Sequence, residues 1–201
     1  MADYSRFFLY LYTRLRKYAM KQSSQVIFER NTVEFVTVAA EYCAFIERCE
    51  GQKRSEFVDT LLKILPLLYI KASMMPECEV MGDDALEAFV NEEDYEVIRI
   101  NMQELMADRD DYLDVFVEEM KYSDTPIRKS IAEDLADIYQ VVKDFVCQFQ
   151  SGLNETMHDA LAQCREHFAG YWGQTLVNTM RALHEVKFSK SDNEDEEEYD
   201  D

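Results

Sequence analysis

The hydrophobic residues of this chain recur at helical spacing, and their densest run lies between Asn31 and Cys49. Apolar side chains occupy almost every side of that segment and leave one narrow polar stripe. The stripe consists of Glu34, Thr37, Glu41 and Arg48. Because a helix that is apolar on almost every side needs neighbours on almost every side, the run predicts the central helix of a bundle. Asn31 is a suitable N-cap for this helix, and Gly51 a suitable stop just past its end.

A second helix is predicted to begin at Ser55, its N-cap, and to end before Pro76. Its apolar positions are Phe57, Val58, Leu61, Leu62, Leu65, Leu68 and Tyr69. Pro66 lies inside this pattern, and proline removes a backbone donor and clashes with the carbonyl of the preceding turn. We therefore expect a kink or a split near Leu62. The acidic stretch 77–90 fits either a loop or a short helix.

A third helix is predicted to begin after Asn91, because this capping residue is followed by carboxylates, which favour the positive end of a helix dipole. Its buried stripe is expected to contain Tyr95, Ile98, Met102 and Leu105. The pattern falters at residues 108–110. It then resumes at helical spacing with Tyr112, Val115, Phe116 and Met120.

Residues 123–126 mark the clearest boundary in the chain, since cap residues precede a proline at a first helical position. The helix that opens there is expected to end at Gly152 and to bury Ile127, Ile131, Leu135, Ile138, Val142, Phe145, Val146 and Phe149. Asn154 is predicted to cap a last helix, in which Gly170 and Gly173 mark a bend or the close approach of a neighbour. The apolar face of this helix consists of Leu161, Cys164, Phe168, Trp172, Leu176, Met180 and Leu183.

These patterns indicate an all-α fold: a single-domain bundle of about six mostly antiparallel helices, with no convincing strand. Five glycines and three prolines in 201 residues suit helices better than a turn-rich β fold. We expect residues 22–188 to form the bundle. Residues 1–21 are expected to be a basic, aromatic extension of weak structure, and residues 189–201 an acidic, disordered tail.

The formal net charge of −20 limits the classes of partner. A field of this sign repels DNA, RNA and anionic membranes, so nucleic-acid binding is excluded as a main role, and a basic protein is the natural partner. No uninterrupted run of about 18 apolar residues occurs, so no transmembrane segment is expected. The five cysteines form no CxxC pair and are expected to be buried free thiols of a cytoplasmic protein.

The carboxylate pattern with the most chemical meaning consists of Glu92, Glu93, Glu96, Asp111 and Asp114. It resembles the EExxE…ExxD signature of all-helical, magnesium-dependent nucleoside triphosphate pyrophosphohydrolases, in which carboxylates on two antiparallel helices hold Mg²⁺ against a triphosphate. Asp111 departs from that signature, which has glutamate there. Only a chain reversal near residues 108–110 could bring the two groups together. A straight helix would instead place them on one solvated face, the simpler interpretation in so acidic a chain.

Three shorter motifs give weaker signals. Asp110–Asp114 matches the DDxxD diphosphate motif of helical prenyl synthases, with residues 133–137 as the nearest second motif. Glu155 and His158 form a single ExxH, whereas a di-iron bundle needs two. Cys164 and His167 are spaced as two zinc ligands on one helix would be, but no second pair matches them. The same residues are also explained by ordinary structural positions, at the starts of helices and in the hydrophobic core.

Five short segments occur in a characteristic order along the chain. They are EYCAFIE at 41–47, LPLLY at 65–69, EDLADIYQ at 133–140, WG at 172–173 and ALH at 182–184. Together they resemble a bacterial helical family catalogued as domain of unknown function 5063. The resemblance covers about residues 26–187 and implies a compact helical domain, but it implies no activity.

The residues therefore favour a cytoplasmic, non-catalytic interaction or regulatory domain with an acidic surface and no required cofactor. The alternative is a Mg²⁺-dependent pyrophosphohydrolase-like enzyme that uses the five carboxylates named above.

Overall fold

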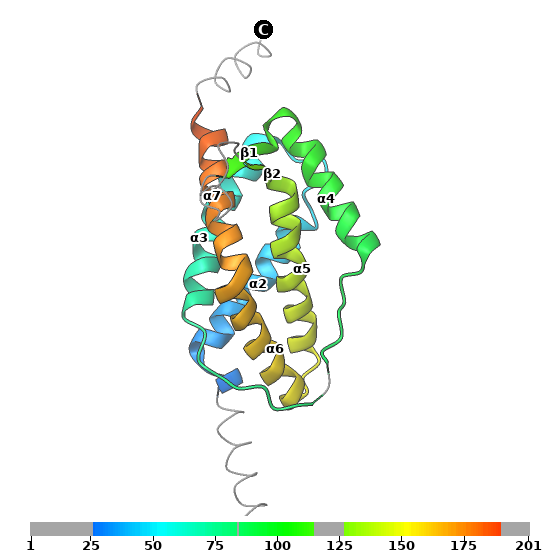
Figure 1. Ribbon diagram of the computed structural model, residues 1–201, viewed down its shortest axis with the longest axis vertical. Coiled ribbons are helices and arrows are strands. Elements are labelled where there is room, and N and C mark those ends of the chain that lie inside the picture. Colours follow the sequence, from blue (N-terminus) through cyan, green and yellow to red (C-terminus); the bar gives the residue numbers. More distant parts are fainter. Residues whose placement is uncertain (1–25, 84, 115–126, 190–201) are drawn as a thin grey trace, which may run out of the picture.

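The computed structural model describes residues 26–83, 85–114 and 127–189. Within these ranges the chain forms a helical bundle with one small sheet, and Figure 1 shows the helices α2, α3, α5, α6 and α7 grouped together, with α4 set to one side. The α-helical segments are α2 (Arg30–Ile46), α3 (Arg54–Ser73), α4 (Glu92–Met106), α5 (Ile131–Gln150), α6 (Asn154–His167) and α7 (Gly173–Phe188). The predicted helical bundle is thus confirmed. None of the helices in the described ranges combines the length and the apolar character needed to cross a bilayer.

Helix α2 confirms the predicted core segment. Phe35, Ala39, Tyr42 and Ile46 are completely buried. Its neighbours are α3 and α5, and the Tyr42 hydroxyl donates a hydrogen bond of 2.9 Å to the Leu135 carbonyl on α5. The predicted cap was wrong: the helix begins at Arg30, and Asn31 lies in its first turn. Helix α5 packs against α2, α4, α6 and α7, so it holds the bundle together.

Helix α3 runs unbroken through Pro66, so the predicted split near Leu62 does not occur. The prediction of Ser55 as N-cap was also wrong, because the N-cap is Lys53 and the helix ends at Ser73, before Pro76. Residues 75–91 contain no helix or strand wherever they are described, which settles that stretch as coil. Asn91 does cap α4, since its Oδ1 accepts the backbone N–H of Asp94 at 2.9 Å.

The prediction that the chain contains no strand was wrong. After α4 and the short 3₁₀ turn Ala107–Arg109, strand β1 (Asp111–Asp114) pairs antiparallel with β2 (Ile127–Ser130), with Tyr112 opposite Lys129. Tyr112 and Ile127, both predicted on helices, therefore lie in strands. The other residues predicted for these elements, Val115 to Met120 and the boundary at 123–126, lie outside the described residues. Ser130 ends β2 and caps α5, its Oγ accepting the N–H of Glu133 at 3.1 Å.

Helices α6 and α7 are joined without a break by a π-helical segment, Phe168–Trp172. The apolar residues along this run, Cys164, Phe168, Trp172 and Leu176, are each four positions apart. An α-helix turns about 100° per residue, so each such step would rotate the apolar stripe by about 40°. The wider π turn absorbs this drift and keeps the stripe facing inward. Asn154, predicted as the cap, is instead the first residue of α6.

Aromatic rings fill the core between α2, α5 and the π segment. Phe35 lies 5.1 Å from Phe145 and 6.5 Å from Trp172 between ring centroids, and Trp172 is completely buried. All five cysteines are free: Cys43, Cys49 and Cys164 are buried, and Cys78 and Cys147 are partly buried. Three of the five thiols are thus buried as predicted, and the other two are only partly buried.

Candidate functional site

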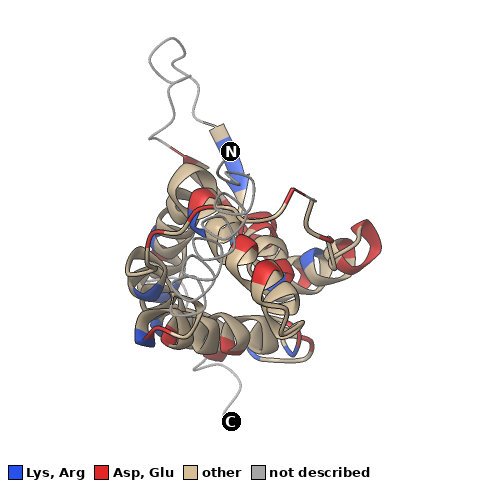
Figure 2. Ribbon diagram, turned by 90° about the horizontal axis from the view of Figure 1, so that it is seen from below, with Lys and Arg blue, Asp and Glu red and all other residues tan. Residues whose placement is uncertain are grey.

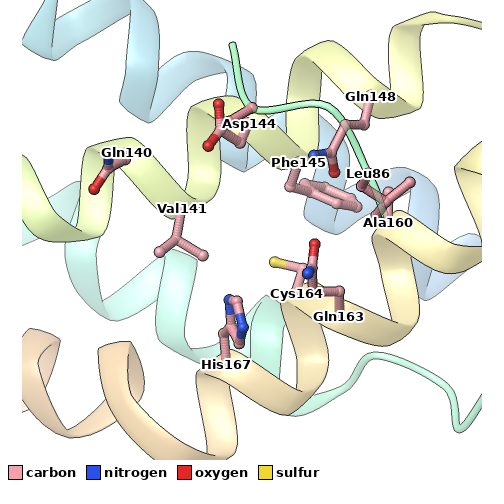
Figure 3. Close-up of a pocket in the computed structure, with 11 residues that line it drawn as sticks. Leu86, Gln140, Val141, Asp144, Phe145, Gln148, Ala160, Gln163, Cys164 and His167 are labelled. Carbon is pink, nitrogen blue, oxygen red and sulfur yellow. The ribbon is translucent and has the colours of Figure 1, made fainter. Parts of the chain in front are cut away.

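A pocket of about 260 Å³ opens between α5 and α6, beneath the coil around residues 86–88. Figure 3 shows side chains of both helices directed toward it, with Val141 and Asp144 contributed by α5 and Cys164 and His167 by α6. Pockets for drug-sized ligands usually enclose about 300–1,000 Å³, so this one is smaller than a nucleotide site requires.

The polar groups of α5 that face the pocket are used to hold the coil in place. Asp144 Oδ1 accepts the backbone N–H groups of Phe89 at 2.7 Å and Val90 at 2.8 Å. Gln148 Nε2 donates to the Glu87 carbonyl at 2.8 Å. These hydrogen bonds show a structural role for Asp144 and Gln148, because each fixes the backbone of a coil segment that has no secondary structure of its own.

Cys164 and His167, the predicted zinc pair, both line the pocket. Burial raises the pKa of the Cys164 thiol, so the group stays protonated at neutral pH and is a poor nucleophile or metal ligand. The two residues of the single ExxH motif lie in different environments: Glu155 is exposed, whereas His158 is buried. Across the described residues, no three His, Cys, Asp or Glu side chains come together as a metal site would require.

The predicted carboxylates lie in two separate places. Glu92, Glu93 and Glu96 are in the first turns of α4, whereas Asp111 and Asp114 are on β1, beyond the other end of that helix. Between them lie the ten residues from Glu96 to Met106, about 15 Å at the rise of an α-helix, and the 3₁₀ turn Ala107–Arg109. No three of these five carboxylates gather at one point of the described structure.

Three of these carboxylates have partners of their own. Glu96 accepts hydrogen bonds from the Arg99 guanidinium, with the shortest distance 2.8 Å, and this bond lowers the pKa of Glu96. Asp111 pairs with Arg128 across the sheet, which lowers the pKa of Asp111. Asp114 is buried, and its Oδ2 accepts from Asn178 of α7 at 3.4 Å.

Two further buried acidic groups beside the sheet, Asp134 and Asp110, lie outside the pattern of five carboxylates. Asp134 of α5 is 3% exposed and accepts hydrogen bonds from the Tyr112 hydroxyl and from Thr179 Oγ1. Desolvation raises the pKa of Asp134. Asp110 accepts from Ser130 and from the backbone of Ala132. Sequence reasoning missed these roles, because Tyr112 and Leu113 are adjacent apolar residues and do not alternate with polar ones as in a strand with one buried side.

Helix α4 presents an outward face that combines apolar and acidic side chains. Val97 is 53% exposed and Ile100 is 42% exposed, and the exposed Glu93 and Glu104 lie on the same side of the helix, before and after them. We call these four residues the α4 face. The opposite side of the helix buries Ile98, Met102 and Met106 and packs on α5. Figure 2 shows acidic residues concentrated at the end of α4 that projects from the bundle.

A protein-family model described as "Domain of unknown function (DUF5063)" matches residues 26–189. A crystal structure of protein BF1032 from Bacteroides fragilis is 60% identical to this chain, with a TM-score of 0.74, and the match covers 83% of this chain and 98% of that one. None of the curated proteins matches the chain.

Proposed function

The chain belongs to the DUF5063 family, and on that premise we propose that it is a non-catalytic interaction module whose α4 face binds a basic, amphipathic segment of a partner protein. The observation that carries the proposal is the exposure of Val97 and Ile100 between carboxylates, on a helix whose inner side is already packed. A helix face of this kind matches a partner helix that bears apolar anchors flanked by lysine or arginine.

Different side chains of the α4 face supply affinity and specificity. Burial of the two aliphatic side chains supplies affinity, at about 25 cal/mol for each Å² of apolar surface removed from water. The carboxylates around them attract basic segments and repel acidic ones, which chiefly sets the association rate and the choice of partner. Within α4 the charged residues are Glu92, Glu93, Asp94, Glu96 and Glu104 against Arg99, so the helix is strongly acidic.

Two further properties support the same role. The net charge of −20 opposes binding to nucleic acid, which is consistent with a protein partner. Five free thiols are the usual state in a reducing compartment, so we place the protein in the cytoplasm.

The test uses a synthetic basic amphipathic peptide, with leucines at helical spacing and lysines on either side, titrated into the full chain by calorimetry. We expect binding to the wild type and a loss of about tenfold or more for Val97→Asp, because an added carboxylate would be desolvated at the contact. Val33→Asp is the matched control, since Val33 is 49% exposed on α2, away from the α4 face. Equal affinity in all three proteins, or no binding to the wild type, would show the proposal to be wrong.

The same pair of variants identifies the natural partner. Proteins retained from a cell extract by the wild type and by V33D, but not by V97D, are the candidates, and we expect them to carry a basic helical segment. Partners retained equally by V97D would place the binding surface elsewhere.

A further inference from the structure

Helices α3 and α7 lie side by side with a shallow groove of about 610 Å³ between them, which we call the α3–α7 groove. Apolar side chains contribute to its lining: Leu62, Val177, Met180 and Phe188. Of these, Val177 is 45% exposed and Phe188 is 62% exposed. The groove therefore leaves apolar surface uncovered along the last helix of the bundle.

Basic side chains also line the groove, which is unusual for so acidic a chain. Lys63 comes from α3, and Arg181 and Lys187 come from α7. The one carboxylate in the lining, Asp59, pairs with both Lys63 and Lys187. Because Lys63 and Lys187 share this single carboxylate, they leave an excess of positive charge in the groove, in a protein whose net charge is −20.

The segment of this chain that follows α7 has the complementary composition. Helix α7 ends at Phe188, which itself lines the groove, and residues 190–201 read KSDNEDEEEYDD. This segment holds eight carboxylates and one aromatic residue, Tyr199. We propose that residues 190–201 dock in the α3–α7 groove, with carboxylates at Lys63 and Lys187 and the Tyr199 ring on the apolar lining.

The chain is long enough for this docking. From Val177 to Lys187 the groove follows ten residues of helix, or about 15 Å. The ten residues from Ser189 to Tyr199 span up to about 33 Å when extended, so Tyr199 can reach any part of the groove after the chain turns back.

Because residues 190–201 are covalently attached to α7, weak contacts are sufficient to keep them in the groove. Exposed ion pairs contribute little individually, and salt screens them. However, a short covalent connection gives an effective concentration in the millimolar range, so the docked state is populated even when the separate peptide would bind only at about millimolar concentration.

A zero-length carbodiimide tests the proposal on the full chain: it activates a carboxylate as an O-acylisourea, and a lysine amine then forms the amide and releases the reagent as a urea. We expect linked peptides that join residues 192–201 to Lys63. Lys53, which is exposed at the N-cap of the same helix but outside the groove, is the internal control and should be linked far less. A mixture of ¹⁴N- and ¹⁵N-labelled protein distinguishes links within one molecule from links between two.

Two variants with matched chemistry complete the test. Val177→Glu places a negative charge in the groove and should reduce the Lys63 product by at least about threefold, whereas Val97→Glu, on the α4 face, should leave it unchanged. Molar salt should reduce the product in the wild type. Equal linkage to Lys53 and Lys63, links only between molecules, or no effect of V177E would each overturn docking within the chain. None of these outcomes bears on partner binding by the α4 face.

Discussion

The carboxylate of Asp110 accepts the backbone N–H of Ala132, at 2.8 Å, and so caps a helix that begins on the far side of the hairpin. Its second oxygen accepts a hydrogen bond from Ser130 Oγ at 2.6 Å, and the Asp110 carbonyl accepts the N–H of Ile131 at 2.8 Å. The residue just before β1 thus accepts the first two N–H groups of α5, and Ser130 accepts the third. An acidic side chain at this position also complements the positive end of the helix dipole.

Asp110→Ala should lower the free energy of unfolding by about 2 kcal/mol, because it removes a helix cap and leaves a buried donor without a partner. Asp108→Ala is the comparison, since it removes ion pairs of an exposed carboxylate with Arg54 and Arg109 and should change the stability by less than about 1 kcal/mol. Urea denaturation of both variants measures the difference. A loss for D110A no larger than that for D108A would contradict the capping role.

Glu34 makes the stability of the folded state depend on pH in the acid range. It accepts hydrogen bonds from Lys71 Nζ of α3 at 2.5 Å and from Arg30 Nε at 2.6 Å, which lower its pKa from 4.5 to about 2. A depressed carboxyl pKa stabilises the folded state above the unfolded value, and this contribution is lost as the pH falls through the folded value. Glu34→Gln should therefore lower Tm at pH 7, and the deficit should shrink between pH 4.5 and pH 2.

Thermal unfolding as a function of pH checks this expectation. Glu41→Gln is the control, because Glu41 is exposed on the same helix, and its Tm should follow the wild type throughout. A deficit of E34Q that stays constant down to pH 2 would show that the charge of Glu34 is not its cause.

The glycines of the π segment should respond to alanine in opposite directions. A Cβ at Gly173 would lie 2.6 Å from the Phe168 carbonyl oxygen and 2.9 Å from the Phe168 ring, so Gly173→Ala should destabilise the fold by about 1–3 kcal/mol. Gly170 has open space at that position, and Gly170→Ala should stabilise by about 0.5–1 kcal/mol through backbone entropy. Equal effects in chemical denaturation would argue against the crowded π geometry.

Ala107, which ends α4, has φ 51° and ψ −120°, a conformation that favours glycine. Ala107→Gly should raise the free energy of unfolding by about 1 kcal/mol, because the relief of strain exceeds the added entropy of the unfolded chain. Ala88→Gly, in coil with negative φ, should instead lower it by about 0.4–1 kcal/mol. If both glycines destabilise, Ala107 is not strained.

Magnesium tests the enzymatic alternative. A ligand that binds only the folded state raises Tm. Because Glu96 and Asp111 are paired with arginines, and Glu96 lies in the first turns of α4 whereas Asp111 lies beyond its other end, we expect millimolar MgCl₂ to produce no more shift than NaCl of equal ionic strength. A rise specific to magnesium, together with pyrophosphate release from a nucleoside triphosphate, would restore the carboxylate site as a candidate.

The sequence predicted the helices well wherever apolar spacing alone determined them. Helix α2 and the start of α4 at Asn91 followed from periodicity and capping chemistry. The hairpin was missed because strand β1 reverses the usual burial of apolar and polar side chains: Leu113 is 53% exposed, whereas Asp114 is 2% exposed. A buried carboxylate is stabilised by its partners from elsewhere in the fold, and the local sequence does not contain them.

The candidate sites likewise combine features that the local sequence shows with features that only the fold creates. The acidic character of α4 is visible in the sequence, but the exposure of Val97 depends on which side of α4 packs on α5. The α3–α7 groove joins residues more than a hundred positions apart, as the pairing of Asp59 with Lys187 shows. No local pattern records such a contact.

The π turn between α6 and α7 also determines where this protein tolerates a change in length. A π turn is an α-helix with one residue inserted, so a homologue that lacks the residue at position 170 could run straight through as a regular α-helix. Every inward contact from Leu176 onward would survive. The same deletion later in α7 would rotate the following side chains by about 100° and turn the buried face away from α3. Sequence alignments of the family should therefore place single-residue gaps at this turn and avoid them in the helices on either side.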